Sequence, residues 1–198
     1  IRFQVNTLPG EDVEHCRVQL VARMACLPEQ GREAVGLLAE ILRGTDFSDR
    51  KLLRDQLSQA ALNAQMNLAA NGEEYAEIRV GAYNSARGVA REALCGREMA
   101  VWLKEQAAAE DTVLDTVLQT MQTLAVRILA ENRMTVSCSD NLEEKLLDIL
   151  ALPQGSPAPK WAVYAPWGAR QEGLTIPASV SFAVKGTNFK CHGGSFSG

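Results

Sequence analysis

The sequence predicts an α+β fold in which helices pack on one face of a mostly antiparallel sheet. Two observations support this prediction. Alternating apolar residues indicate strands near the start of the chain and again after residue 133, whereas helical periodicity fills most of residues 34–131. Strands that are separated by a block of helices, instead of alternating with single helices, are typical of α+β proteins. With 46% apolar and 22% charged residues, the composition fits a globular chain.

Two strands are expected first. Residues 2–7 alternate, with Phe3 and Val5 on one face, and Leu8-Pro9-Gly10 ends this strand. Residues 16–27 form the second candidate. Its alternating apolar residues are Val18, Leu20 and Ala22. Pro28 ends the strand or begins the next helix, because proline is tolerated in the first turn of a helix.

Two amphipathic helices should follow. The apolar stripe of the first is Ala34, Leu37, Leu38, Ile41 and Leu42. Gly44 is a typical C-terminal stop, and Asp46 or Ser48 is a suitable N-cap for the second helix. The apolar stripe of the second is Leu53, Leu57, Ala60, Ala64 and Leu68. Asn71-Gly72 closes that helix.

Residues 73–94 are predicted to form one helix. Its inward residues are Tyr75, Ile78, Ala82, Ala86 and Val89. Gly81 and Gly88 each weaken a helix by about 1 kcal/mol relative to alanine. We therefore expect these glycines to serve a close approach between helices. Gly96 then turns the chain before a short helix. That helix carries Met99, Trp102 and Leu103.

The strongest helical pattern covers residues 112–131. Its apolar residues are Val113, Leu114, Val117, Leu118, Met121, Leu124, Ala125, Ile128 and Leu129. Such a stripe predicts core packing, and a coiled-coil partner is the alternative. Asn132 stops the helix.

The remaining elements are shorter. Met134, Val136 and Cys138 alternate as a strand. Asp140 is the expected cap of a last helix, which carries Leu142, Leu146, Leu147 and Leu150. A Pro/Gly/Ser-rich stretch then covers residues 153–159, and residues 178–185 alternate like a strand. A final piece of about 40 residues is too small to bury its own core, so we expect the chain to be part of a larger protein.

Charge and hydropathy exclude some function classes. The net charge of -4 gives no hint of a nucleic-acid partner, and no apolar run approaches the ~18 residues that span a membrane. The nearest approach to a basic cluster is Arg79, Arg87, Arg91 and Arg97. Glu77, Glu92 and Glu98 dilute it, so it is interpreted as a solvated helix face.

Five cysteines are present: Cys16, Cys26, Cys95, Cys138 and Cys191. The odd count, without a Cys-x-x-Cys pair, indicates reduced thiols and favours a reducing compartment such as the cytoplasm. The compartment of an intact protein stays unknown. Cys26 and Cys138 have apolar neighbours and are predicted to be small core residues.

One segment has a partial metal-site pattern. Residues 11–15 end in Glu14-His15, as does the inverted zinc motif His-x-x-Glu-His, but Glu11 replaces the first histidine. We interpret the segment as a solvated acidic turn; a self-contained metalloenzyme using Glu11, Glu14 and His15 is the weaker alternative. Cys191-His192 has no second ligand pair nearby.

Nucleophile and phosphate motifs are not complete either. Ser195 and Ser197 lie in a glycine-rich tail and form no Gly-x-Ser-x-Gly elbow. Gly193-Gly194 lacks the Gly-Lys-Ser/Thr of a phosphate loop. The sequence therefore predicts no catalytic, cofactor-binding or metal-binding residue in this chain.

Several stretches together resemble a known family. They are residues 26–30, 41–42, 45–49, 52–72, 75–76, 93–96 and 174–198. In this co-linear order the chain resembles the third domain, and the entry into the fourth, of presequence-protease-type zinc metallopeptidases of the pitrilysin/insulinase class. The resemblance implies a peptidase-associated domain at 1–152, a linker at 153–173 and the start of a following domain at 174–198.

The resemblance also implies a role. Such enzymes enclose an unfolded peptide between two halves, and their zinc-binding His-x-x-Glu-His helix lies in the first domain. The chain would then be a non-catalytic wall of the substrate chamber, inactive alone, with zinc in the N-terminal half of the parent protein. Its partners would be the other domains and the peptide substrate. Self-association of the isolated chain stays open, and the alternative is a helical interaction or scaffolding module without enzymatic activity.

Overall fold

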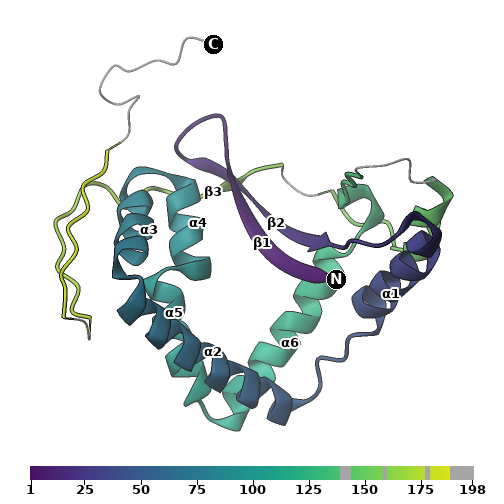
Figure 1. Cartoon of the computed structure of the whole chain (residues 1–198), viewed down its shortest axis with the longest axis horizontal. Helices are drawn as coiled ribbons and strands as arrows, with labels where there is room; N and C mark the ends of the chain where they lie inside the picture. The colour runs from purple at the N-terminus through teal and green to yellow at the C-terminus, as the bar shows by residue number, and fades with distance from the viewer. Residues whose placement is uncertain (139–143, 158–159, 177–178, 188–198) are drawn as a thin grey trace. The chain divides into compact units, whose positions relative to one another are not determined.

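The computed structural model describes residues 1–138, 144–157, 160–176 and 179–187 (Figure 1). The chain divides into two compact units. The first comprises Ile1–Gln4, Leu20–Leu53 and Glu110–Ala158. The second comprises Val5–Gln19, Arg54–Ala109 and Pro159–Gly198. The sequence-based division at residues 152 and 173 concerns the family's domains, and it stays a prediction.

The strands form a three-stranded sheet in the order β1-β2-β3. β1 (Arg2–Pro9) and β2 (His15–Arg23) are the two strands that the sequence predicts, although β2 ends at Arg23 and not at residue 27. β3 (Ala162–Val163) pairs antiparallel with β2. It lies within the predicted linker and was not foreseen, because two residues carry no readable periodicity. A helix-rich chain with this small sheet confirms the α+β class.

Small residues form the core beside β2. Cys16 is fully buried and packs with Ala86, Ala90 and the half-buried Ala162. The alternating residues Val18 and Leu20 are 39% and 44% exposed. The period-two pattern therefore located the strand correctly. Because Cys16, Val18 and Leu20 share one face of the strand, that face is covered at Cys16 and open to solvent at Val18 and Leu20.

The core of the first unit forms around α1. The 3-10 helix η1 (Pro28–Gln30) leads into α1 (Gly31–Gly44), whose buried residues Val35 and Ala39 pack with Leu150. Leu38 and Leu42 of the predicted stripe are half-buried in this cluster. Leu37 and Ile41 are 50% and 41% exposed, so the buried face is rotated toward Val35 and Ala39.

Leu150 belongs to η3 (Glu144–Leu150), a 3-10 helix where the sequence predicts the last helix. The proposed cap Asp140 and Leu142 lie outside the described residues. Residues 134–138 and 179–185 are not strands, contrary to prediction, and Ala178 is not described. An alternating pattern makes a strand only when a neighbour pairs with it.

Two cysteine predictions are wrong. Cys26 and Cys138 are exposed, whereas Cys16 is buried. Apolar neighbours in sequence did not predict burial, since the segments around both cysteines are irregular. Burial raises the pKa of the Cys16 thiol, which makes it a packing residue and not a reactive one.

α2 (Arg50–Ala70) begins after both predicted caps, Asp46 and Ser48. The Asp49 carboxylate accepts a hydrogen bond from the Leu52 N–H at 2.8 Å and is the N-cap. Asp46 instead closes a turn by accepting from the Ser48 N–H at 2.9 Å. α2 buries Leu57 and Ala61, while Leu62 and Met66 are 56% and 70% exposed.

α6 (Asp111–Ile128) departs most from expectation. Leu114 is its one buried residue. Five of its apolar side chains are exposed: Val113, Met121, Leu124, Val126 and Ile128. The predicted core packing of this stripe is therefore wrong for the described structure. α6 ends at Ile128, and the 3-10 helix η2 (Glu131–Arg133) covers the predicted helix end.

Candidate functional site

The predicted helix at 73–94 is two helices. α3 (Gly72–Asn84) and α4 (Ala86–Cys95) are separated by Ser85, whose backbone is extended. The Ser85 hydroxyl accepts a hydrogen bond from the Gly88 N–H at 3.0 Å and caps α4. Serine is a preferred N-cap residue, but apolar spacing continues across Ser85 and hides the break between the two helices.

The two glycines bring these helices together, as the sequence predicts. A Cβ at Gly88 would lie 1.9 Å from the Gly81 carbonyl oxygen, so no side chain fits there. A Cβ at Gly81 would lie 3.7 Å from the Gly88 Cα. Small residues are buried on both helices. They are Ala82 on α3 and, on α4, Ala86 and Ala90, which pack with Cys16 of β2.

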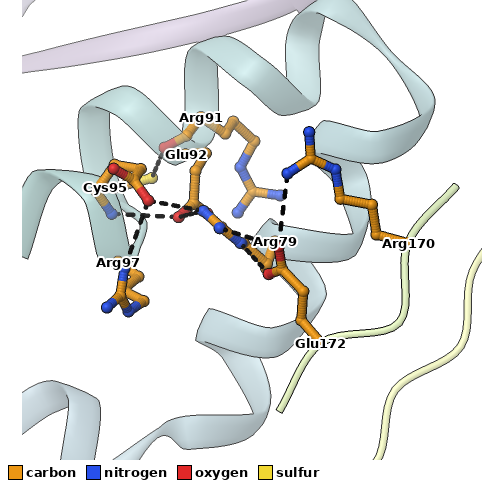
Figure 2. A network of polar contacts seen from close by, with 8 residues as sticks. Arg79, Arg91, Glu92, Cys95, Arg97, Arg170 and Glu172 are labelled. Atoms are coloured by element: carbon orange, nitrogen blue, oxygen red, sulfur yellow. Dashed lines mark hydrogen bonds and ion pairs between the residues drawn. The ribbon is translucent and has the colours of Figure 1, made fainter. Parts of the chain in front are cut away.

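A charged group lies where α3, α4 and α5 (Arg97–Ala107) converge, and we call it the Arg79 cluster (Figure 2). It comprises Arg79, Tyr83, Glu92, Glu98, Trp167 and Glu172. Arg79 Nη1 is 3.1 Å from Glu92 Oε1 and 2.9 Å from Glu98 Oε1. Arg79 Nε is 2.8 Å from Glu172 Oε2. One guanidinium thus forms ion pairs with three carboxylates.

The cluster corrects the prediction of a solvated helix face. The Arg79 side chain is 12% exposed and that of Glu92 is fully buried. Arg87, Glu77 and Glu98 are exposed, as predicted. Sequence distance hid the main partner, because Glu172 is 93 residues from Arg79.

Two aromatic side chains complete the cluster. The guanidinium carbon of Arg79 lies 4.6 Å from the Trp167 ring centroid, a cation–π distance. The rings of Trp167 and Tyr83 are 6.3 Å apart at a tilt of 48°. The backbone N–H of Trp167 donates to the Ala82 carbonyl at 3.0 Å, which ties this segment to α3.

These contacts shift the pKa values of three groups in the cluster. Burial opposes the charge on Arg79, but hydrogen bonds to Glu172 and Glu98 outweigh it and raise the guanidinium pKa. Hydrogen bonds from Arg79 and Tyr83 lower the pKa of Glu172 to about 2. Burial, followed by the bond to Glu172, raises the pKa of the Tyr83 phenol. Arg79 and Glu172 stabilise each other's charges, whereas Tyr83 is held in its neutral form, so none of the three is poised for proton transfer near neutral pH.

Glu92 also orders the start of α5. Its Oε1 accepts a hydrogen bond from the Glu98 N–H at 3.2 Å. A Cβ at Gly96 would lie 2.3 Å from Oε2, so the carboxylate occupies the space that a side chain there would need. Oε2 itself has no hydrogen-bond partner among the described residues.

The acidic segment at 11–15 forms the turn between β1 and β2. Asp12 Oδ1 is 2.7 Å from His15 Nδ1, and this hydrogen bond lowers the pKa of Asp12. Glu11 and Glu14 are exposed. In the part of the chain that the structure describes, no group of three His, Cys, Asp or Glu side chains is placed to hold a metal ion.

The remaining candidate site residues cannot be placed. Cys191, His192, Ser195 and Ser197 lie outside the described residues. Among the helices that are described, none combines the length and the hydropathy needed to cross a bilayer. That the chain supplies no catalytic, cofactor or metal residue stays a prediction.

The sequence comparisons identify the class. Residues 1–106, just over half of the 198-residue chain, match the family described as peptidase M16C associated. The chain belongs to this family. The matched part contains β1 to α5, except the last residue of α5, and with them Arg79, Glu92 and Glu98, but not Trp167 or Glu172.

The chain is also similar to two curated proteins, one of which is named as a protease. The chain is similar to the mitochondrial presequence protease of Yarrowia lipolytica, with 30% identity over 112 residues, 56% of this chain and 11% of that protein. It is also similar to the protein HypA of Clostridium perfringens, with 22% identity over 178 residues, 87% of this chain and 18% of that protein. The chain thus spans less than a fifth of either relative. No solved structure gives a significant match.

Proposed function

We propose that this chain is a non-catalytic segment of a zinc metallopeptidase that degrades peptides, and that it forms part of the wall of a closed substrate chamber. The observation that carries the proposal is the match of residues 1–106 to a peptidase-associated family. The similarity to a presequence protease supports the same class. Zinc would be bound by another part of the parent polypeptide, through an inverted His-x-x-Glu-His motif.

The chemistry of the described residues supports a structural role. The Arg79 guanidinium binds the carboxylates of Glu92, Glu98 and Glu172, so these charges are paired with one another. The contribution of the chain to catalysis would be enclosure of the substrate, which excludes water and holds the peptide.

Partners would be the other domains of the same polypeptide and the peptide substrate. Exposed apolar side chains support contacts with further protein, since Met66 on α2 is 70% exposed and Val126 on α6 is 74% exposed. The same exposure favours the second candidate function, a helical interaction module without an enzyme. It equally leaves open self-association of the isolated chain.

Peptide hydrolysis tests the proposal. The chain alone, with added zinc and a fluorogenic unstructured peptide, should show no turnover and bind less than about a tenth of an equivalent of zinc. Mixing it with the segment of the parent polypeptide that carries the zinc motif should produce hydrolysis. A Glu11→Gln/Glu14→Gln variant should behave identically in the mixture.

Other results select the alternatives. Chelator-sensitive hydrolysis by the chain alone, lost in the Glu11→Gln/Glu14→Gln variant, would contradict the proposal and assign a metal site to the β1–β2 turn. If the parent polypeptide carried no zinc motif, the second candidate function, a helical interaction module without enzymatic activity, would be favoured instead.

A further inference from the structure

The segment at residues 160–176, which we call the strap, is fastened to the rest of its unit at several points. The Arg17 guanidinium donates to the Lys160 carbonyl, and the Tyr164 N–H donates to the Glu14 carbonyl at 3.0 Å. Trp167 is bound to the end of α3 through the Ala82 carbonyl. These contacts position the strap, and Glu172 adds an ion pair with the largely buried Arg79.

Arg79 divides its donors between the strap and the helices. Nε and Nη2 donate to Glu172 at 2.8 and 3.4 Å, the two-pronged geometry of a strong carboxylate pair. Nη1 donates to both Glu92 and Glu98, at 3.1 and 2.9 Å. Figure 2 shows Arg79 between Glu92 on one side and Glu172, on the strap, on the other.

This division leaves one buried group unsatisfied. Glu92 is fully buried, yet its Oε2 has no partner among the described residues. A buried carboxylate oxygen without a hydrogen bond costs free energy, of the order of 1–3 kcal/mol or more for a charged group. The fork of Arg79 could satisfy both oxygens of Glu92 only by turning away from Glu172.

We propose that Arg79 is the switch point of a two-position device that couples the strap to the start of α5. In the position seen here, Arg79 holds the strap through Glu172 and leaves Glu92 Oε2 unsatisfied. In the other position, the guanidinium binds both oxygens of Glu92 and releases the strap. Because Glu92 Oε1 also accepts the Glu98 N–H, drawing this carboxylate toward Arg79 weakens the first turn of α5.

Amide hydrogen exchange of the whole chain tests the coupling. Glu172→Gln removes the charge that holds Arg79 on the strap. It should speed exchange about tenfold in residues 160–176, since a charge-assisted hydrogen bond is lost. It should also speed exchange of the Glu98 amide on α5. The matched control is Ile176→Ala, which loosens the strap where it contacts Gly72, away from Arg79. This control should leave the Glu98 amide unchanged.

A second variant, at Glu98, distinguishes a two-position switch from a cluster that only holds the strap in place. Glu98→Gln removes a competing carboxylate at an exposed position, so it should fold normally and slow exchange in the strap by two- to fivefold as Arg79 commits to Glu172. Faster strap exchange in Glu98→Gln would mean that the cluster is one cooperative fastening, and would overturn the proposal. So would an unchanged Glu98 amide in Glu172→Gln.

Discussion

α6 and the α3–α4 pair reverse the order of burial that their sequences suggest. α6 carries the strongest apolar periodicity in the chain but buries Leu114 alone. α3 buries Gly72, Ile78, Ala82 and Tyr83, and α4 buries Ala86, Gly88, Ala90 and Glu92. Small residues let the α3 and α4 backbones approach closely, whereas an amphipathic stripe only marks a face that could be covered.

The largest effect should come from breaking the buried charge pair between α3 and α4. Arg79→Met leaves the fully buried Glu92 without its cation, which should cost about 3–5 kcal/mol of unfolding free energy. Urea denaturation measures this. The double variant Arg79→Met/Glu92→Met removes both charges and should recover most of the loss. If the double variant were as unstable as the single one, the cost would not come from the unpaired carboxylate.

Closing the space between the helices should have the next largest effect. Gly88→Ala places a methyl group against the Gly81 backbone, which cannot yield as a side chain would, and should destabilise the chain by about 3 kcal/mol. Gly36→Ala on α1 is the matched control, because no atom lies within 4 Å of the added Cβ. It should stabilise α1 by about 0.5–1 kcal/mol. Equal effects of the two substitutions would contradict the close-approach account.

The loss of stability at acid pH should depend on Glu172. The pKa of this carboxyl is lowered from 4.5 to about 2 by Arg79 first and then by Tyr83, with Arg170 adding to the effect. Because the folded-state pKa is depressed, the stabilisation is complete above pH 4.5 and is lost as the pH falls toward 2. The difference in urea midpoint between wild type and Glu172→Gln should therefore shrink over this range. A constant difference would contradict the pairing.

The smallest effect should come from α6. Val126 is 74% exposed, so Val126→Ser should change the unfolding free energy of the chain by less than about 0.5 kcal/mol. Circular dichroism during thermal unfolding suffices as a measurement. A loss comparable to that of Gly88→Ala would show that the apolar stripe of α6 is covered in solution.

Local patterns predicted what local interactions determine. Alternation predicted β1 and β2, spacing predicted α1, α2 and α5, and the weak helix propensity of Gly81 and Gly88 predicted their close contact. What failed depends on distant residues. The partner of Arg79 is 93 residues away, and β3 exists only because β2 offers a free edge. The family assignment needed the comparison with residues 1–106, because no single motif carries it.

Amide hydrogen exchange of the unmodified chain measures the protection of α6 against that of α3 and α4. The slowest amides should be those of α3 and α4 around Gly81, Ala82, Ala86 and Ala90, because these helices bury the most residues and approach most closely. Amides of α6 beyond Leu114 should exchange much faster. Protection in α6 equal to or greater than that in α3 and α4 would contradict the account.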